Sequence, residues 1–145
     1  MNKYVIFLML VIGCKSLDNN NLKYIDYFDS KFDLKIDNNT SILIVNLKGC
    51  PKCTSHILKH LENNKLKENV LPLIVGSKNE ISFYKSNKRL NKINKIYFDQ
   101  LESAYKYDLD IASVALINLK NSGCQVKFID SFNVQEQILD LTLNI

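Results

Sequence analysis

The feature that most constrains this chain is a short apolar run followed at once by two closely spaced cysteines. Residues 42–47 are mostly apolar, Gly49 follows, and Cys50 and Cys53 stand three positions apart. Residues 51–66 have the pattern of a helix, which places Cys50 at the helix N-terminus. Unpaired N–H groups and a partial positive charge at that end favour a thiolate over a thiol. Two thiols one turn apart can close into a disulfide with little movement, so the segment indicates thiol–disulfide chemistry.

The size and composition of the chain allow one domain with a hydrophobic core. It has 145 residues, of which 46% are hydrophobic, and seven Phe and seven Tyr provide bulk in the absence of Trp. The net charge of +4 comes mostly from scattered lysines. The densest basic stretch, residues 85–95, has no aromatic–glycine motif beside it. This spacing is typical of a solvated helix face, so we expect no nucleic acid as a partner.

Residues 1–13 have the pattern of a signal peptide. A short positive start precedes an apolar run at residues 4–12, which is too short to span a bilayer and has the length of a signal-peptide core. The run ends in Val11-Ile12-Gly13-Cys14, which resembles the lipobox of bacterial lipoproteins. That resemblance implies that Cys14 is lipidated and that its acyl chains hold the protein on a membrane. The alternative is an ordinary secretory signal with an incidental cysteine.

These features predict three parts: a signal peptide at 1–13, a lipidated tether at 14–21 and a folded domain at 22–145. The tether is polar and rich in Asn. The protein would be lipid-anchored and extracytoplasmic in the bacterial cell envelope, on the periplasmic side or at the cell surface. A disulfide persists in such a compartment. Cys50 and Cys53 are then the natural pair, and Cys124 is left over as an inert hairpin residue, a third redox thiol or an intermolecular partner.

The rest of the chain alternates short strand and helix patterns. We expect strands at residues 32–36, 42–47, 70–75, 95–98, 114–119 and 125–129, and helices at residues 22–32, 51–66, 79–90, 100–107 and 133–143. Residues 120–124 indicate a hairpin turn. Pro72 lacks a donor, so it should lie at a sheet edge or a bulge. The order of elements predicts an α/β fold with a mixed sheet covered on both faces.

At this point the chain resembles the thioredoxin-like superfamily over roughly residues 40–145. The resemblance is strongest at the strand, loop, Cys50-Pro51-Lys52-Cys53 motif and helix. It is weaker at the late hairpin, where Lys120, Asn121 and Gly123 fit the family's final turn. The resemblance implies a thioredoxin-like mixed β-sheet flanked by helices. Together with the lipobox, it is most similar to membrane-tethered extracytoplasmic thioredoxin-like reductases and redoxins.

The resemblance implies a thiol–disulfide oxidoreductase that acts on the disulfides or thiols of exported proteins. Cys50 would attack a substrate disulfide, and Cys53 would resolve the mixed disulfide. Lys48 and Lys52 would favour the Cys50 thiolate. No cofactor is implied, and a membrane redox partner would supply electrons. The alternatives for the motif alone are half of a zinc site or a structural disulfide.

The substrate groove is expected at the residues beside the cysteines, namely Gly49, Pro51, Lys52, Ser113 and Val114. The family has a cis-proline at the place of Val114, and this chain has no proline beyond Pro72. Because a non-proline cis bond costs ~2.5–4 kcal/mol, we expect a trans peptide there. The family's buried acid is also missing, since the strand offers only Ile44 and Asn46.

Two histidines support a second interpretation. Cys53, His56 and His60 share a helix face, and with Cys50 they form a Cys-x2-Cys-x2-His-x3-His pattern. These ligand types suit Cu(I) or Zn(II), so one alternative function is a copper- or zinc-binding chaperone. In the redox interpretation there is no metal, and His56 is a proton partner of Cys53. A further alternative is a non-catalytic, redoxin-like scaffold lipoprotein.

Overall fold

The structure, a computed structural model, describes residues 19–111, 113–121 and 123–142, and it is built on one five-stranded sheet. The strands are β1 (Ser41–Asn46), β2 (Val70–Gly76), β3 (Tyr97–Gln100), β4 (Val114–Lys120) and β5 (Gly123–Ile129). Their order in the sheet is β3-β2-β1-β4-β5. β1, β2 and β3 run parallel, whereas β4 is antiparallel to both β1 and β5. The sheet is therefore mixed, as predicted.

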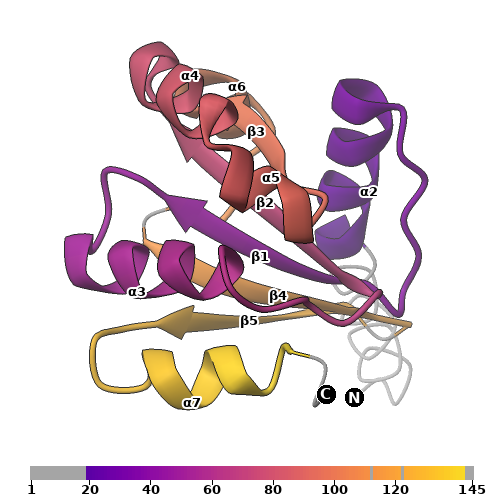
Figure 1. Cartoon of the computed structure of the whole chain (residues 1–145). Helices are drawn as coiled ribbons and strands as arrows, with labels where there is room; N and C mark the ends of the chain where they lie inside the picture. The colour runs from indigo at the N-terminus through magenta and orange to yellow at the C-terminus, as the bar shows by residue number, and fades with distance from the viewer. Residues whose placement is uncertain (1–18, 112, 122, 143–145) are drawn as a thin grey trace, which may run out of the picture.

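Helices cover both faces of this sheet (Figure 1). In the described residues they are α2 (Asn19–Phe32), α3 (Pro51–Leu61), α4 (Lys78–Ser86), α5 (Lys88–Ile93), α6 (Leu101–Lys106) and α7 (Val134–Leu139). Leu43 and Val45 of β1 pack with α3 and α7, whereas Ile42 and Ile44 pack with α2 and α6. This alternation follows from the two-residue period of a strand. The predicted fold class, an α/β thioredoxin-like mixed sheet flanked by helices, is confirmed.

Strand β1 lies at the centre of the sheet and delivers the chain to the cysteines. Five of its six residues are buried, which explains why its sequence is apolar without the alternation of a half-exposed strand. Pro72 lies in β2 and pairs with Leu43 of β1. On the other side of β2, pairing with β3 begins only at Leu73. Pro72 therefore lies where β2 has no neighbour on the β3 side, which agrees with the expected edge position.

The predicted strand at residues 32–36 is wrong. α2 ends at Phe32, and Asp33 takes a left-handed backbone conformation with φ of 50°. Leu34 and Ile36 are half-buried and pack against the cluster on the α2 side. Their alternation with polar residues therefore reflects contact with the core and not pairing in the sheet. The sheet consists of β3, β2, β1, β4 and β5, and residues 32–36 are not part of it.

Four of the predicted helices differ from the observed helices by more than one residue. The cysteine helix stops at Leu61, and the last helix stops at Leu139. The helix expected at residues 79–90 is two helices, because Asn87 ends α4 and its side chain accepts N–H bonds from the first turn of α5. α2 begins at Asn19, three residues before the expected start and inside the segment expected as tether.

Helix α2 is fixed to the sheet by aromatic residues. Tyr24, Tyr27 and Phe28 are fully buried. The Tyr27 hydroxyl donates to Asp99 at 2.9 Å, and the Tyr24 hydroxyl donates to Asp110. Burial raises the pKa of both tyrosines, so they remain neutral donors. The predicted helix is thus an integral layer of the fold.

The predicted signal peptide, the lipidated Cys14 and most of the predicted tether lie outside the described residues. Within the described ranges, no helix is both long enough and apolar enough to cross a bilayer.

Candidate functional site

Cys50 and Cys53 form a disulfide at the start of α3, with their Cα atoms 5.3 Å apart. Cys50 is the N-cap residue of the helix, and its Sγ accepts a hydrogen bond from the Cys53 N–H at 3.3 Å. Pro51 follows in the first turn, where the N–H that it lacks would have no helical partner. When the disulfide is reduced, the same N–H group and the helix N-terminus favour negative charge on the Cys50 sulfur.

The two sulfurs have unequal access to solvent. Cys50 is partly exposed, and the neighbouring Pro51 and Lys52 are exposed. Cys53 is 0% exposed and belongs to the core cluster of α3, where it packs with residues such as Ile57. An incoming thiol or disulfide can therefore reach Cys50 but not Cys53. The close pair is compatible with a redox-active Cys-x-x-Cys motif.

The segment before β4 lies against the turn that carries Cys50. A Cβ placed on Gly49 would lie 3.1 Å from the Ser113 Cα and 3.2 Å from the Asn46 carbonyl oxygen. Val114 is fully buried, opens β4 and pairs with Val45. The segment that leads into β4 therefore passes close to Gly49, the residue before Cys50. The Ser113–Val114 peptide is trans, which agrees with the expectation, and no cis bond occurs in the described ranges.

Asn46 joins the backbone segments around the disulfide. It is the last residue of β1 and only 5% exposed. Its Nδ2–H donates to the Ile111 carbonyl, and its Oδ1 accepts from the Lys48 N–H at 3.0 Å. From the sequence, Asn46 was notable only because it cannot act as the proton-accepting buried acid of the family. A polar side chain at the end of an otherwise apolar central strand was the signal of a structural role.

Thr54 adds a second buried polar contact next to Cys53. It is 6% exposed, and its Oγ1–H donates to the Asn46 carbonyl oxygen at 3.3 Å. Its backbone N–H bonds to the Cys50 carbonyl at 2.9 Å, the first full turn of the helix. A threonine inside a helix pattern gives no distinctive signal in the sequence, so Thr54 is not among the predicted site residues.

The two histidines lie on the side of α3 that faces α7. His56 and His60 line a hollow of about 260 Å³ together with Val134 and Ile138 of α7. Burial lowers the pKa of His60, which favours its neutral form. In the part of the chain that the structure describes, no three His, Cys, Asp or Glu side chains are grouped so that they could hold a metal ion. The four predicted metal ligands are therefore not assembled as a site here.

Cys124 is a free thiol far from the disulfide. It is the second residue of β5, pairs with Leu119 and packs against the cluster on the α2 side. Ile129, at the other end of β5, pairs with Val114 near the cysteines. Cys124 and Ile129 are five positions apart along the strand, which corresponds to about 17 Å. Burial raises the pKa of the Cys124 thiol, so its thiolate is disfavoured.

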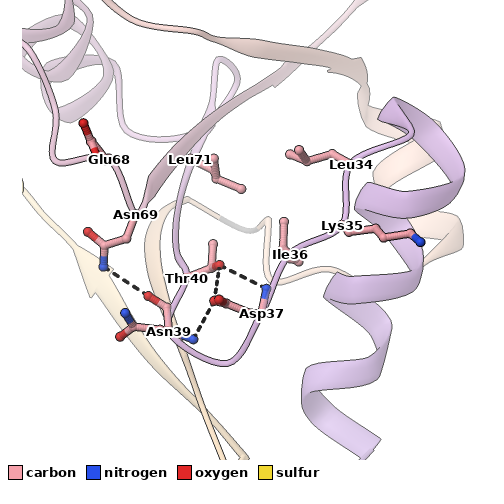
Figure 2. Close-up of a pocket in the computed structure, with 9 residues that line it drawn as sticks. All are labelled: Leu34, Lys35, Ile36, Asp37, Asn39, Thr40, Glu68, Asn69 and Leu71. Atoms are coloured by element: carbon pink, nitrogen blue, oxygen red, sulfur yellow. Dashed lines mark hydrogen bonds between the residues drawn. The ribbon is translucent and has the colours of Figure 1, made fainter.

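Figure 2 shows another hollow, of about 350 Å³, at the opposite end of β1 from the cysteines. Leu34, Ile36 and Leu71 form its apolar side. Two pairs of its polar groups bond to each other: Thr40 Oγ1–H donates to Asp37 at 3.1 Å, and Asn69 Nδ2–H donates to the Asn39 carbonyl at 3.1 Å. These groups are therefore already paired within the protein.

Comparison of the chain with protein-family models, with curated proteins and with solved structures gives no match. Fold and site together define the class: a mixed α/β protein with a disulfide-bonded Cys-x-x-Cys pair at a helix N-terminus, which is compatible with a thioredoxin-like fold.

Proposed function

We propose that this protein is a thiol–disulfide oxidoreductase of the thioredoxin-like superfamily and that it acts on exported proteins. The observation that carries the proposal is the asymmetry of the disulfide. Cys50 is partly exposed at the N-terminus of α3, whereas Cys53 is fully buried beneath it. Such a pair offers one sulfur for attack and reserves the other for resolution.

In the reducing direction, the Cys50 thiolate attacks one sulfur of a substrate disulfide. The substrate S–S bond breaks, a Cys50–substrate disulfide forms, and the first substrate thiolate leaves and takes up a proton. The Cys53 thiolate then attacks the Cys50 sulfur, and the second substrate thiolate leaves. The substrate gains two electrons and two protons, and the protein ends in the disulfide form seen here.

A dithiol on a membrane redox partner is proposed to return the two electrons. Exchange runs backward as oxidation when the potential of the pair is higher than that of its substrate. No organic cofactor takes part in either direction.

Several residues near Cys50 have proposed supporting roles. Lys48 and Lys52 are exposed cations close to the nucleophile, and they favour its thiolate with an effect limited by solvent screening. Gly49, Pro51, Ser113 and Val114 are proposed to border the substrate groove. His56, one turn after Cys53, is proposed as a proton partner.

The proposed location is the bacterial cell envelope, outside the cytoplasm. In this proposal residues 1–13 are removed as a signal peptide, and the lipid on Cys14 tethers the domain at residues 22–145 through a short polar segment. The motif that resembles a lipobox supports this part of the proposal. An oxidising compartment keeps structural disulfides of substrates intact until they are exchanged.

Trapping of the mixed disulfide tests the proposed mechanism. The Cys53→Ser variant lacks the resolving thiol, so incubation of its reduced form with a peptide that contains one internal disulfide should leave the peptide attached to Cys50. Mass spectrometry after acid quenching measures the adduct. Cys50→Ser should form no adduct, and Cys53→Ser with Cys124→Ser should form as much as Cys53→Ser alone. An adduct at Cys124 only, or none, would contradict the mechanism.

A further inference from the structure

We propose that Asn46 is a positioning residue for disulfide exchange with polypeptide substrates. Its amide bonds to Ile111, and the Ser113 backbone lies beside Gly49, next to the position where the superfamily that this chain resembles has a cis-proline. This inference rests on the proposed function, because it concerns how a substrate chain is aligned for attack by Cys50.

Asn46 uses nearly all of its polar groups to connect separate backbone segments. The side chain donates to the Ile111 carbonyl and accepts from the Lys48 N–H at 3.0 Å. The carbonyl oxygen of Asn46 accepts from the Gly49 N–H at 3.0 Å and from Thr54 Oγ1–H at 3.3 Å. One residue thus fixes the turn before Cys50, the first turn of α3 and the segment that leads into β4.

The bond to Ile111 is the only side-chain link among these that reaches across to the β4 segment. Ile111 lies 65 positions from Asn46 and is 2% exposed. Two residues later, the Ser113 backbone passes within 3.1 Å of the position that a Gly49 Cβ would occupy. The segment is therefore held against the cysteine turn by a buried hydrogen bond while its Ser113–Val114 peptide remains trans.

The geometry affects large and small reaction partners differently. A polypeptide disulfide must align its backbone beside both Gly49 and Ser113 before its sulfur lies in line with Cys50. A small disulfide such as oxidised glutathione needs only access to the exposed side of Cys50. A loss of alignment by 1 Å can slow a reaction by up to about 100-fold, so loss of the bond that holds Ile111, and with it the Ser113 backbone, should slow polypeptide exchange selectively.

Asparagine suits this position because it is both a donor and an acceptor. Serine has a shorter side chain with a single hydroxyl, so Asn46→Ser removes the bond to the Ile111 carbonyl, keeps a short acceptor for the Lys48 N–H and adds no charge beside Cys50.

The chain offers a matched control in Asn94. It is also buried, at 9% exposure, and its Oδ1 accepts from the Leu66 N–H at 2.9 Å. Its Nδ2–H donates to the carbonyls of Leu61 and Asn64, both at 2.9 Å. These contacts lie at the C-terminal end of α3, about 16 Å from Cys50 by the length of the helix. Asn94→Ser makes the same chemical change away from the disulfide.

The test compares kcat/KM of the full chain for a disulfide-containing peptide and for oxidised glutathione. For Asn46→Ser we expect about a tenfold loss with the peptide, mainly through KM, and a change of less than about twofold with glutathione. For Asn94→Ser we expect both rates to stay near those of the wild type, although its thermal midpoint falls. If either serine variant does not fold, the pair Asn46→Ala and Asn94→Ala is compared instead.

Equal losses with both substrates, or the same selective loss in the Asn94 variant, would show that Asn46 only supports the fold and would overturn the inference. If the wild-type protein exchanges with neither glutathione nor the peptide, the proposed function itself is overturned. The two failures are therefore distinguishable.

Discussion

The contact between Gly49 and the β4 segment gives a sharp test of the site geometry through Gly49→Ala. A Cβ at this position would meet the Ser113 Cα at 3.1 Å and the Asn46 carbonyl oxygen at 3.2 Å. Both neighbours are backbone atoms, so neither can move by a side-chain rotation. Gly49 is not among the residues with positive φ, so the substitution tests space alone.

The expected size of the effect follows from two opposing contributions. Crowding of two backbone segments that must separate by a few tenths of an ångström costs about 1–2 kcal/mol. Loss of glycine freedom in the unfolded chain returns about 0.4–1 kcal/mol. The midpoints of these two ranges differ by about 0.8 kcal/mol, so we expect Gly49→Ala to lower the free energy of unfolding by roughly this amount, which is about 2–4 °C in thermal midpoint for a domain of this size.

Urea or thermal unfolding of the oxidised protein measures this difference. Lys48→Ala is the matched control, because Lys48 is exposed in the same turn and keeps its backbone N–H bond to Asn46. We expect the control to differ from the wild type by less than about 0.5 kcal/mol. A Gly49→Ala protein as stable as wild type would refute the close approach, and so would a control with an equal loss.

Three further outcomes are expected. In the reduced protein, iodoacetamide should modify Cys50 before Cys124, since the helix N-terminus favours the Cys50 thiolate while burial raises the pKa of Cys124, and mass spectrometry of quenched samples gives the order. Burial lowers the pKa of His60, so the folded state binds a proton at this side chain less readily than the unfolded state. The free energy of unfolding should therefore fall as the pH drops below about 6.5. Unfolding curves measured over a pH series should show that His60→Gln removes this fall. The capping box of α4 predicts that Ser77→Ala lowers stability by about 1 kcal/mol at pH 7. The hydrogen bonds from Ser77 lower the pKa of Glu80, so the stability that they supply should be lost as the pH falls below about 4.5 through the folded pKa; equal stability of wild type and Ser77→Ala at pH 7 would contradict this.

Much of the fold could be predicted from the sequence, because most of its strands and helices have clear local patterns. The apolar run of β1 stands directly before the cysteines, and β4 stands directly before β5, so neither arrangement needs knowledge of distant contacts. The disulfide could be expected for the same reason, since three positions on a helix bring two sulfurs within reach.

The errors arose where distant contacts decide the structure. Leu34 and Ile36 alternate with polar residues as a strand would, but their partners are buried side chains of the α2-side cluster rather than a neighbouring strand. The bond from Asn46 to Ile111 joins residues 65 positions apart, and no local pattern reveals it. His56 and His60 share a helix face with Cys53 by spacing, yet Cys53 is buried in the core while the histidines line a hollow beside α7.

The central claim is that Cys50 and Cys53 are a working redox couple, and a redox titration tests it most directly. The purified protein is treated with a chelator, equilibrated against a series of glutathione or dithiothreitol mixtures, and alkylated to count free thiols. The account predicts a reversible two-electron transition that is lost in Cys50→Ser, and its midpoint potential gives the direction of exchange. The absence of a transition would contradict the account. So would thiols that react with the alkylating reagent only after the chelator has removed a bound metal ion.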